Sequence, residues 1–470
     1  MHESCGVFGI YAPGINVAQT TFFALFALQH RGQESAGIAV SDGNGIKLHT
    51  RMGLVSQAFT ETDLALLQGY VGIGHNRYST TGSSKPMNAQ PIIAKSEGLS
   101  IALAHNGNII NARLLRDELQ QRGYQFNTSS DSEVIGNLIL ASSGQNWQEK
   151  IEHATHRLQG AYSLVILAED KLIGVRDPFG VRPLCLGTID GGWCIASESC
   201  ALDHIGAQFT KEVDPGETLV IDSQGVHSFR QESDRKALCI FEYIYFARPD
   251  SIIQGKLLYP AREAMGRILS EEYPVEADFV MGVPDSATAA GIGYSHASGI
   301  PYCECLLKNR YVGRTFIEPE QRIRELGVQL KFNPLSRIIA GKRLVVVDDS
   351  IVRGTTTPRV VGLLRKAGAT EVHLRICAPP IRHPCFFGVD MATKWELIAA
   401  RKTIPEIREH LGADSLGYLS VDGLIRAVGL PRDMFCLACF TGEYPIPVQI
   451  EMDKLALEAL PQEDLIGADH

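Results

Sequence analysis

The stretch LVVVDDSIVRGTTT, from Leu344 to Thr357, constrains the fold of this chain more than any other. Its apolar residues run without a break into Asp348 and Asp349, a pattern typical of a parallel strand that is buried on both faces. The two carboxylates then emerge at the carboxyl edge of the sheet, where open α/β sheets bind their ligands. We therefore expect a doubly wound α/β domain with a binding site at this edge.

The loop after the acidic pair indicates an anionic ligand. We expect Thr357 to cap the following helix and Pro358 to take its first position. Gly354 permits close approach of a backbone, and the threonine hydroxyls and free N–H groups at a helix start form a cradle for phosphate. Two carboxylates beside such a cradle suit a ligand that carries a phosphate and a vicinal diol.

Upstream, GVPDSATAAGIGY repeats this arrangement. We expect a strand to end at Val283–Pro284 and Asp285–Ser286 to open a helix of small residues. Pyrophosphate with Mg²⁺ suits this helix start, because Mg²⁺ prefers oxygen ligands and keeps several waters. The segment KNRYVGRTFIEPEQRIRELG follows, and it is either a solvated charged loop or a lid that closes over a polyanion. Its basic residues include Lys308, Arg310, Arg314, Arg322 and Arg324.

The first half of the chain has a different rhythm. Short strand-like runs alternate with turns, and helical patterns occur in QTTFFALFALQHR and SSDSEVIGNLILASS, where Ser130 or Asp131 can be the N-cap. We expect stacked sheets with helices outside. A polar stretch at about 228–237 predicts a domain boundary, and 470 residues are enough for two to four domains.

Composition excludes several classes of function. Forty-four basic residues against 53 acidic ones give a net charge of −9, which argues against nucleic-acid and anionic-membrane partners. No apolar run reaches about 18 residues, so we expect no membrane span. Eleven cysteines in a long chain indicate a reducing compartment, and we expect the cytoplasm.

Cys436 and Cys439 have C-x-x-C spacing, for which zinc, iron–sulfur and redox interpretations compete.

The acidic-pair stretch resembles the phosphoribosylpyrophosphate (PRPP) signature of type I phosphoribosyltransferases. Together with CGVFGI, HRGQESAGIA, HNRYSTTG, AHNGN, SSDSE, GVPDS, KNRYVGRTFI, HPCF and CLACFTGEYP, it makes the whole chain resemble the glutamine PRPP amidotransferases (amidophosphoribosyltransferases) of the iron–sulfur class. The resemblance implies an α+β N-terminal-nucleophile glutaminase domain, an αββα sandwich, at residues 5–230. A type I phosphoribosyltransferase domain at 238–445 and a tail at 446–470 would follow.

For the first domain, the resemblance implies a cysteine nucleophile. Residues 1–4 would be a propeptide whose removal exposes Cys5, because an α-amino group beside the thiol can relay its proton. Without these neighbours Cys5 would be interpreted as an ordinary buried cysteine. Asn106 and Gly107 resemble an oxyanion hole, Arg77 the partner of the glutamine α-carboxylate, and Asp131 the partner of its ammonium.

For the second domain, the resemblance implies a set of ligand-binding residues. The PRPP site would contain Asp348, Asp349, Ser350, Arg353, Gly354, Thr355, Thr356, Lys308 and Arg310. Mg²⁺ would be held by Ser286, Asp348 and Asp349. A [4Fe–4S] cluster would be held by Cys239, Cys385, Cys436 and Cys439, with Cys377 a weaker competitor.

The implied reaction begins with release of ammonia from glutamine at Cys5. The ammonia displaces pyrophosphate from PRPP to give 5-phosphoribosylamine, the first committed step of purine biosynthesis. Purine nucleotides are expected inhibitors, and a homotetramer is the expected assembly. Three alternatives are a relative of glucosamine-6-phosphate synthase, a non-catalytic PRPP-sensing regulator and an iron–sulfur redox protein. The PRPP signature disfavours the first, the glutaminase motifs the second, and the lack of a flavin or nicotinamide motif the third.

Overall fold

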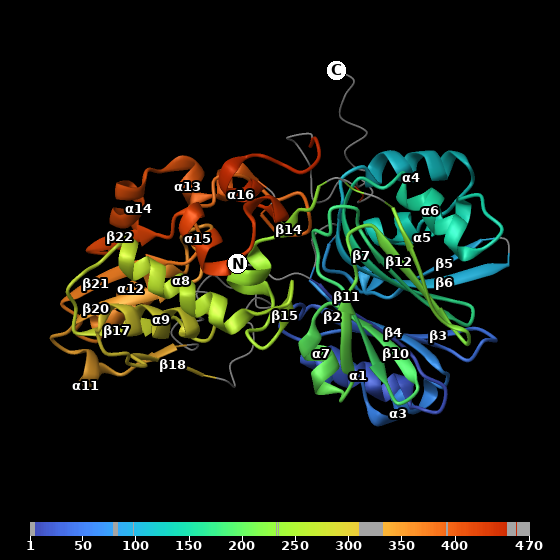
Figure 1. Ribbon diagram of the computed structural model, residues 1–470, viewed down its shortest axis with the longest axis horizontal. Coiled ribbons are helices and arrows are strands. Elements are labelled where there is room, and N and C mark those ends of the chain that lie inside the picture. Colours follow the sequence, from blue (N-terminus) through green and yellow to red (C-terminus); the bar gives the residue numbers. More distant parts are fainter. Residues whose placement is uncertain are drawn as a thin grey trace, which may run out of the picture.

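The computed structural model describes residues 5–78, 83–96, 98–231, 233, 235–309, 332–391, 393–448 and 457. They form two halves that lie side by side along the longest axis of the molecule, the first coloured blue to green and the second yellow to red in Figure 1. Residues 1–4, Arg310, Arg314, Arg322 and Arg324 of the predicted lid, and most of the tail lie outside the described residues. Among the helices of the described part, none is long and apolar enough to cross a membrane.

The first half is built on two antiparallel sheets. The seven-stranded sheet has the order β11-β9-β10-β1-β4-β2-β3 and the six-stranded sheet the order β13-β12-β8-β7-β6-β5. The strands of the larger sheet are β1 (Gly6–Tyr11), β2 (Ser35–Ser41), β3 (Ile46–Met52), β4 (Val71–Arg77), β9 (Cys185–Ile189), β10 (Gly192–Ala196) and β11 (Gln208–Glu212). Those of the smaller sheet are β5 (Ile92–Ser96), β6 (Leu99–Ile109), β7 (Gly160–Ala168), β8 (Lys171–Arg176), β12 (Glu217–Asp222) and β13 (Gly225–Arg230).

Alternation along the strands produces four layers. In β1, Val7 packs into the core between the two sheets, whereas Phe8 packs on the opposite side against Leu25 of helix α1. Helices α1 (Val17–Ala27) and α7 (Ser199–His204) cover the larger sheet. Helices α4 (Ala112–Gln121), α5 (Asp131–Ala141) and α6 (Trp147–Thr155) cover the smaller one. The short elements of this half are α2 (Val55–Ala58), α3 (Glu61–Leu66) and η1 (Pro86–Asn88).

The second half contains a parallel sheet in the order β17-β20-β21-β22. Its strands are β17 (Phe279–Gly282), β20 (Arg343–Asp348), β21 (Glu371–Ile376) and β22 (Ser415–Tyr418). In β20, Val345 and Val347 pack into the core on the side of α8 (Leu258–Glu272), α9 (Thr288–Ser298) and α15 (Val421–Val428). Leu344 and Val346 pack on the other side with α12 (Thr357–Lys366) and α14 (Ile404–Leu411). The strand is therefore buried on both faces, as its sequence predicts.

The remaining elements of the second half are short. They are β15 (Ile252–Ile253), β16 (Lys256–Leu257), β18 (Leu306–Lys308), β19 (Phe332–Pro334), α11 (Ser336–Ile339), η4 (Lys394–Glu396), α13 (Ile398–Arg401), η5 (Arg432–Met434) and α16 (Ala438–Thr441). Leu457 of the tail returns to the first half, where it joins the apolar core under α4, α5 and α6.

One apolar cluster at the junction contains residues of both halves. After the polar stretch, β14 (Leu238–Cys239) pairs in parallel with β23 (Phe435–Cys436), and a π-helical turn, η2 (Glu242–Phe246), follows. Ala161 and Val181 of the first half belong to the same buried cluster as residues of η2, α8 and α16. The halves are thus packed against each other rather than merely tethered.

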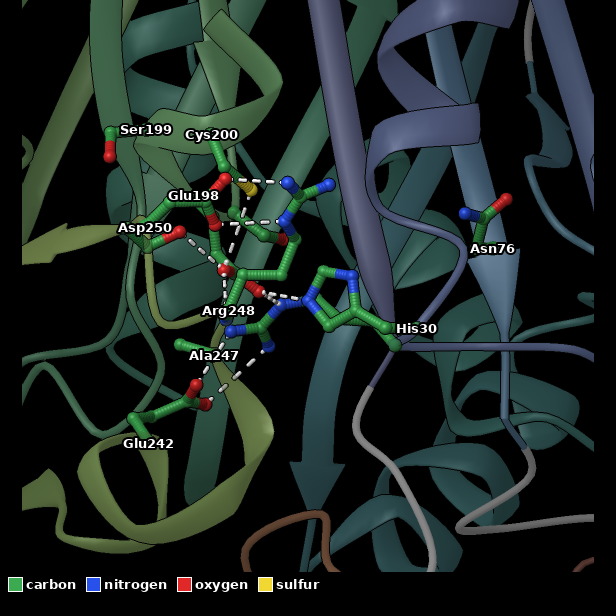
Figure 2. A network of polar contacts seen from close by, with 12 residues as sticks. His30, Asn76, Glu198, Ser199, Cys200, Glu242, Ala247, Arg248 and Asp250 are labelled. Atoms are coloured by element: carbon green, nitrogen blue, oxygen red, sulfur yellow. Dashed lines mark hydrogen bonds and ion pairs between the residues drawn. The ribbon is translucent and has the colours of Figure 1, made fainter. Parts of the chain in front are cut away.

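A buried group of charged residues crosses this junction, and we call it the interface charge network: Arg31, Arg182, Glu198 and Glu242. All four side chains are fully buried. Arg31 pairs with Glu198 and, at 2.5 Å between Nη2 and Oε2, with Glu242. Arg182 Nη1 lies 3.3 Å from Glu242 Oε1. Figure 2 shows Glu198 and Glu242 in this network, with His30 and the Arg248 backbone also bonded to Glu198.

Two positive and two negative charges make the network neutral, as buried charges require. Burial alone would raise the pKa of Glu198, but the charges of Arg31 and His30 hold it well below its usual range. Burial would likewise lower the pKa of Arg31, and the charges of Glu198 and Glu242 raise it instead. Arg31 and Glu198 therefore keep each other charged.

Candidate active sites

Cys5 lies immediately before β1, a strand in the middle of the larger sheet. Its Sγ donates to the Tyr78 carbonyl at 3.1 Å and accepts from the Tyr78 N–H at 3.4 Å. Burial raises the pKa of the Cys5 thiol to about 11. The Tyr78 hydrogen bond and the Arg77 charge oppose this rise, whereas the Glu34 and Asp131 charges add to it. The thiol is thus surrounded by ionisable groups from three separate segments.

Both predicted glutamine-binding residues are among these groups. Arg77 ends β4, is 2 % exposed, and donates from Nη1 to the Ser83 carbonyl at 3.2 Å. Asp131 is the first residue of α5, and its Oδ2 accepts from the Ile109 N–H at 3.1 Å. Ser130, not Asp131, is the N-cap of α5, since its side chain accepts from the Ser132 N–H. The Asp131 carboxylate is therefore not used for capping.

The predicted oxyanion-hole residues lie on β6, the long strand of the smaller sheet. Asn106 is 1 % exposed and is paired with Ser163 in the register of β6 and β7. Gly107 has φ +153°, and a Cβ there would lie 2.0 Å from the Ala161 carbonyl oxygen. The backbone therefore passes so close at this position that only glycine fits.

Sequence reasoning missed four neighbours of this site. Glu34 and Tyr78 lie inside the quoted motifs HRGQESAGIA and HNRYSTTG, so these motifs could have indicated both residues as neighbours of the site. Gly388 and Asp390 come from the second half: Gly388 packs on Gly107, and Asp390 accepts from the Tyr78 hydroxyl at 3.3 Å. Nothing in the local sequence around these two residues indicates this contact.

At the edge of the parallel sheet, the structure brings the acidic pair and Ser286 together. Asp348 ends β20, and the Asp349 N–H donates to Asp348 Oδ1 at 2.9 Å. Ser286 donates from Oγ to Asp349 Oδ2 at 2.6 Å, and Ser350 to Asp349 Oδ1 at 2.5 Å. Carboxylate and hydroxyl oxygens from two neighbouring strand ends thus meet, which is the kind of donor set that Mg²⁺ prefers.

The phosphate loop runs from Ser350 to Thr356, and its helix begins one residue earlier than expected. Thr356, not Thr357, is the N-cap of α12, and its side chain makes no capping hydrogen bond because its own backbone is already helical. Gly354 has φ +68°, and a Cβ there would lie 2.5 Å from Ile398 Cδ1. Arg353 pairs with Glu396 at 2.8 Å, and Thr355 is exposed.

The upstream helix, by contrast, begins later than the sequence predicts. Strand β17 ends at Gly282, and α9 starts at Thr288 rather than at Asp285–Ser286, because the intervening residues form a turn. Lys308, at the end of β18, pairs with Asp285 through its ammonium. Lys308 therefore lies next to the turn that carries Ser286, while Arg310 lies outside the described residues.

The four predicted cluster cysteines converge at the junction of the halves. Cys239 and Cys436 are register partners in the β14–β23 pair, and Cys439 lies in α16. Burial raises the pKa of Cys439, and the charges of Cys436, Cys239 and Cys385 raise it further. Cys377 belongs elsewhere, since the acidic charges that raise its pKa after burial are those of Asp349 and Asp348. Among the described residues, no group of three or more His, Cys, Asp or Glu could hold a metal ion.

Comparison with known proteins places the chain in a family. The glutamine amidotransferase domain profile matches residues 75–204. The amidophosphoribosyltransferase of Synechococcus elongatus is 50 % identical over 467 residues, which cover 97 % of this chain and 95 % of that protein. That of Methanocaldococcus jannaschii is 49 % identical and covers 95 % and 98 %. The chain belongs to the amidophosphoribosyltransferase family.

Solved structures of this family agree with the observed architecture. The glutamine PRPP amidotransferase of B. subtilis, complexed with ADP and GMP, superposes with a TM-score of 0.90 at 45 % identity, covering 97 % of this chain and 100 % of that one. A structure described as the allosteric regulatory enzyme of purine biosynthesis gives a TM-score of 0.91 at 46 % identity, covering 97 % and 99 %. The predicted fold class, a glutaminase sandwich followed by a phosphoribosyltransferase domain, is confirmed. The three alternatives are therefore set aside: the synthase relative, the regulator and the redox protein.

Proposed function

We propose that the two sites of this amidophosphoribosyltransferase divide the reaction between them, with residues 5–230 releasing ammonia from glutamine and residues 238–445 using it. The observation that carries the assignment of the first site is the placement of Arg77 and Asp131 around Cys5. Arg77 directly precedes Tyr78, whose backbone bonds the Cys5 sulfur, and the charges of Arg77 and Asp131 both act on the thiol. A cation and an anion beside a thiol are the groups that an α-amino acid substrate requires next to a nucleophile.

In the first site, the Cys5 thiolate attacks the side-chain amide carbon of glutamine. The Asn106 amide and the Gly107 N–H stabilise the oxyanion, ammonia leaves, and water then releases glutamate from the thioester. Arg77 holds the α-carboxylate of the substrate and Asp131 its ammonium. The ammonia passes within the protein to the second site.

Removal of residues 1–4 is part of this proposal. With these residues attached, the Cys5 thiol has a pKa of about 11, so it is protonated near neutral pH. Removal would place an α-amino group, with an ordinary pKa of about 7.7–8.0, directly beside the thiol. That amine could take the thiol proton at neutral pH.

In the second site, Asp348 and Asp349 hold the ribose of PRPP and the loop from Ser350 to Thr356 holds its 5-phosphate. Ser286 and the acidic pair would hold Mg²⁺, which when bound neutralises charge on the pyrophosphate leaving group. Lys308 adds positive charge near the same group, and the family resemblance assigns the same role to Arg310. Ammonia then displaces pyrophosphate from the ribose to give 5-phosphoribosylamine.

The four cysteines at the junction fit a [4Fe–4S] cluster in their chemistry. Four thiolates are its expected ligand set. Cys239, Cys385, Cys436 and Cys439 would hold it in a structural role. The Arg182 charge, which acts on Cys239 and on Cys436, would offset part of the negative charge of the four thiolates.

Nucleotide regulation, assembly and location complete the proposal. A relative has been seen with ADP and GMP bound, which supports purine nucleotides as inhibitors here. A homotetramer and a cytoplasmic location stay predictions from the family resemblance.

One substitution tests the division of labour directly. Cys5→Ala should abolish glutamine-dependent synthesis, because the nucleophile is lost, and leave ammonia-dependent synthesis intact. Cys194→Ala is the matched control, since Cys194 is another buried cysteine of the same sheet outside the site. Steady-state assays with glutamine and with ammonium chloride measure both activities. Equal loss of the two in Cys5→Ala would refute the assignment.

Removal of the first four residues and assembly of the cluster are tested together by mass. Anaerobically purified protein should lack residues 1–4 in denaturing mass spectrometry and carry four iron and four sulfide in the native spectrum. Cys436→Ser should lose the iron and keep the trimmed N-terminus. An intact N-terminus in active protein would contradict the maturation step, and iron-free active protein would contradict the cluster.

A further inference from the structure

A segment of the second half lies against the first site, and we call it the strap, residues Cys385–Asp390. Three of its contacts with the glutaminase half lie close to the first site. The Asn108 side chain donates to the Phe386 carbonyl at 2.9 Å, Gly388 packs on Gly107, and the Tyr78 hydroxyl donates to Asp390. Asn108 adjoins Gly107, and the Tyr78 backbone brackets the Cys5 sulfur. The strap therefore contacts both sides of the proposed nucleophile site.

The contact between Gly388 and Gly107 is backbone on backbone. Gly388 has φ +92°, in the left-handed region, and a Cβ there would lie 2.9 Å from Gly107 C, 3.0 Å from its Cα and 3.0 Å from its carbonyl oxygen. On another side, Gly107 is closely approached by the Ala161 carbonyl. Because backbone cannot move aside as a flexible side chain can, these two contacts fix where the Gly107 peptide lies.

The strap is itself held by a buried guanidinium. Arg182, fully buried on the loop before β9, donates from Nε at 3.1 Å and from Nη2 at 2.8 Å to the Phe387 carbonyl. Its Nη1 is anchored on Glu242 of the interface charge network. The carbonyl that Arg182 holds belongs to the peptide that joins Phe387 to Gly388. Arg182, a member of the interface charge network, thus fixes the strap at the peptide that leads into Gly388, the residue that contacts Gly107.

We propose that the strap is the outer wall of the glutaminase oxyanion hole, and that Gly388 and Arg182 are positioning residues for the Gly107 peptide. The inference rests on the proposed role of Asn106 and Gly107. Neither positioning residue touches glutamine; they act by holding Gly107 where the oxyanion forms. The transferase half then supplies part of the geometry on which the glutaminase half depends.

The test compares two glycine substitutions in the full-length enzyme. Gly388→Ala should push on the Gly107 backbone and lower the kcat of glutamine hydrolysis by about 10- to 100-fold, the scale of a misplaced catalytic group. The KM for glutamine and ammonia-dependent synthesis should stay within about twofold. Gly299→Ala is the control: Gly299 also has a left-handed backbone, φ +73°, but nothing lies within 4 Å of its added Cβ.

A chemical readout separates positioning from general damage. Alkylation of Cys5 by iodoacetamide forms no oxyanion, so its rate, read on the Cys5 peptide by mass spectrometry, should be the same in Gly388→Ala and in the unmodified enzyme. Should Gly388→Ala fail to fold, Arg182→Lys decides, because lysine keeps the charge but loses the two-nitrogen contact with Phe387. It should show the same loss in kcat without loss of ammonia-dependent synthesis.

The outcomes also distinguish this inference from the proposed function. If Gly388→Ala, or Arg182→Lys in its place, hydrolyses glutamine as well as Gly299→Ala does, the strap has no positioning role. It is also overturned if alkylation of Cys5 falls as much as kcat does. If Cys5→Ala itself still hydrolyses glutamine, the proposed function fails and the inference with it. If Cys5→Ala loses only its glutamine-dependent activity and the strap variants show no effect, the proposed function stands and only the inference is removed.

Discussion

At the scale of single residues, burial and charge act against each other on the Cys5 thiol. The same sandwich core that fixes the sulfur also removes it from water, and desolvation favours the neutral thiol. Arg77 alone would favour the thiolate, but Glu34 and Asp131 carry opposite charge nearby and oppose it. In this environment the sulfur is held in place but is not yet activated.

The reactivity of Cys5 should therefore depend steeply on pH while residues 1–4 are attached. Below its folded pKa of about 11, the thiolate fraction and the alkylation rate should rise roughly tenfold per pH unit between about pH 7 and pH 9. In protein that begins at Cys5, the neighbouring amine should flatten this rise near pH 8. Iodoacetamide labelling of the Cys5 peptide measures both profiles. A flat profile in the uncleaved chain would show that the thiol is already activated.

At the scale of elements, β20 and the loop after it form one functional unit. The apolar strand is fixed by cores on both faces, so the Asp348 and Asp349 carboxylates have a rigid support. Ser286 and Ser350 donate to the two oxygens of Asp349, which orients that carboxylate. The loop then turns at Gly354 into α12. The Asp348 and Asp349 carboxylates are thus held precisely at the sheet edge because the strand that carries them is buried on both faces.

Asp348→Asn combined with Asp349→Asn should separate the two half-reactions. The amides keep the size of the side chains and can still accept from Ser286, but they lose the charges proposed to hold Mg²⁺. Synthesis of 5-phosphoribosylamine should fall by at least about 100-fold with either nitrogen donor, while glutamine hydrolysis persists. Glu276→Gln, an exposed acid of the same half, is the control. Unchanged product formation in the double variant would refute the PRPP site.

At the scale of the whole molecule, the interface charge network connects the halves by ions rather than by apolar contact alone. Glu242 accepts from both Arg31 and Arg182, so two buried cations depend on one carboxylate. Such a group is stable only while every charge is matched, because an unpaired buried ion is costly. The network therefore specifies one way of packing the halves together.

Glu242→Gln should lower the stability of the whole protein. It removes the carboxylate that pairs with Arg182 and leaves Arg31 with only Glu198, which should cost about 3–5 kcal/mol. Glu271→Gln breaks the exposed Arg267–Glu271 pair and should cost less than about 1 kcal/mol. Thermal unfolding of the two variants measures the difference. Equal midpoints would show that the buried network contributes nothing to the packing of the halves.

How much could be predicted from the sequence differs from site to site. The acidic pair and Ser286 sit in short motifs at the ends of neighbouring strands, so rules of local structure already indicate that they meet. Cys239 and Cys385 follow only from the family resemblance, because sequence spacing cannot select the partners of Cys436 and Cys439. Helix starts were displaced by one to three residues, since Thr356 is already helical and Asp285 lies within a turn. The Gly388–Gly107 contact could not be predicted, because it joins positions 281 residues apart through the packing of two separate domains.

The place of Cys5 in the sheet has a consequence for the order of events in time. The first backbone rung of β1 joins Gly6 to Asn76, and the pairing continues to Tyr11 and Val71. Every rung of this strand therefore survives if the peptide bond between Ser4 and Cys5 is cut. Folding can then come first and cutting second, so that the nucleophile is created inside a finished fold instead of having to find its place afterwards.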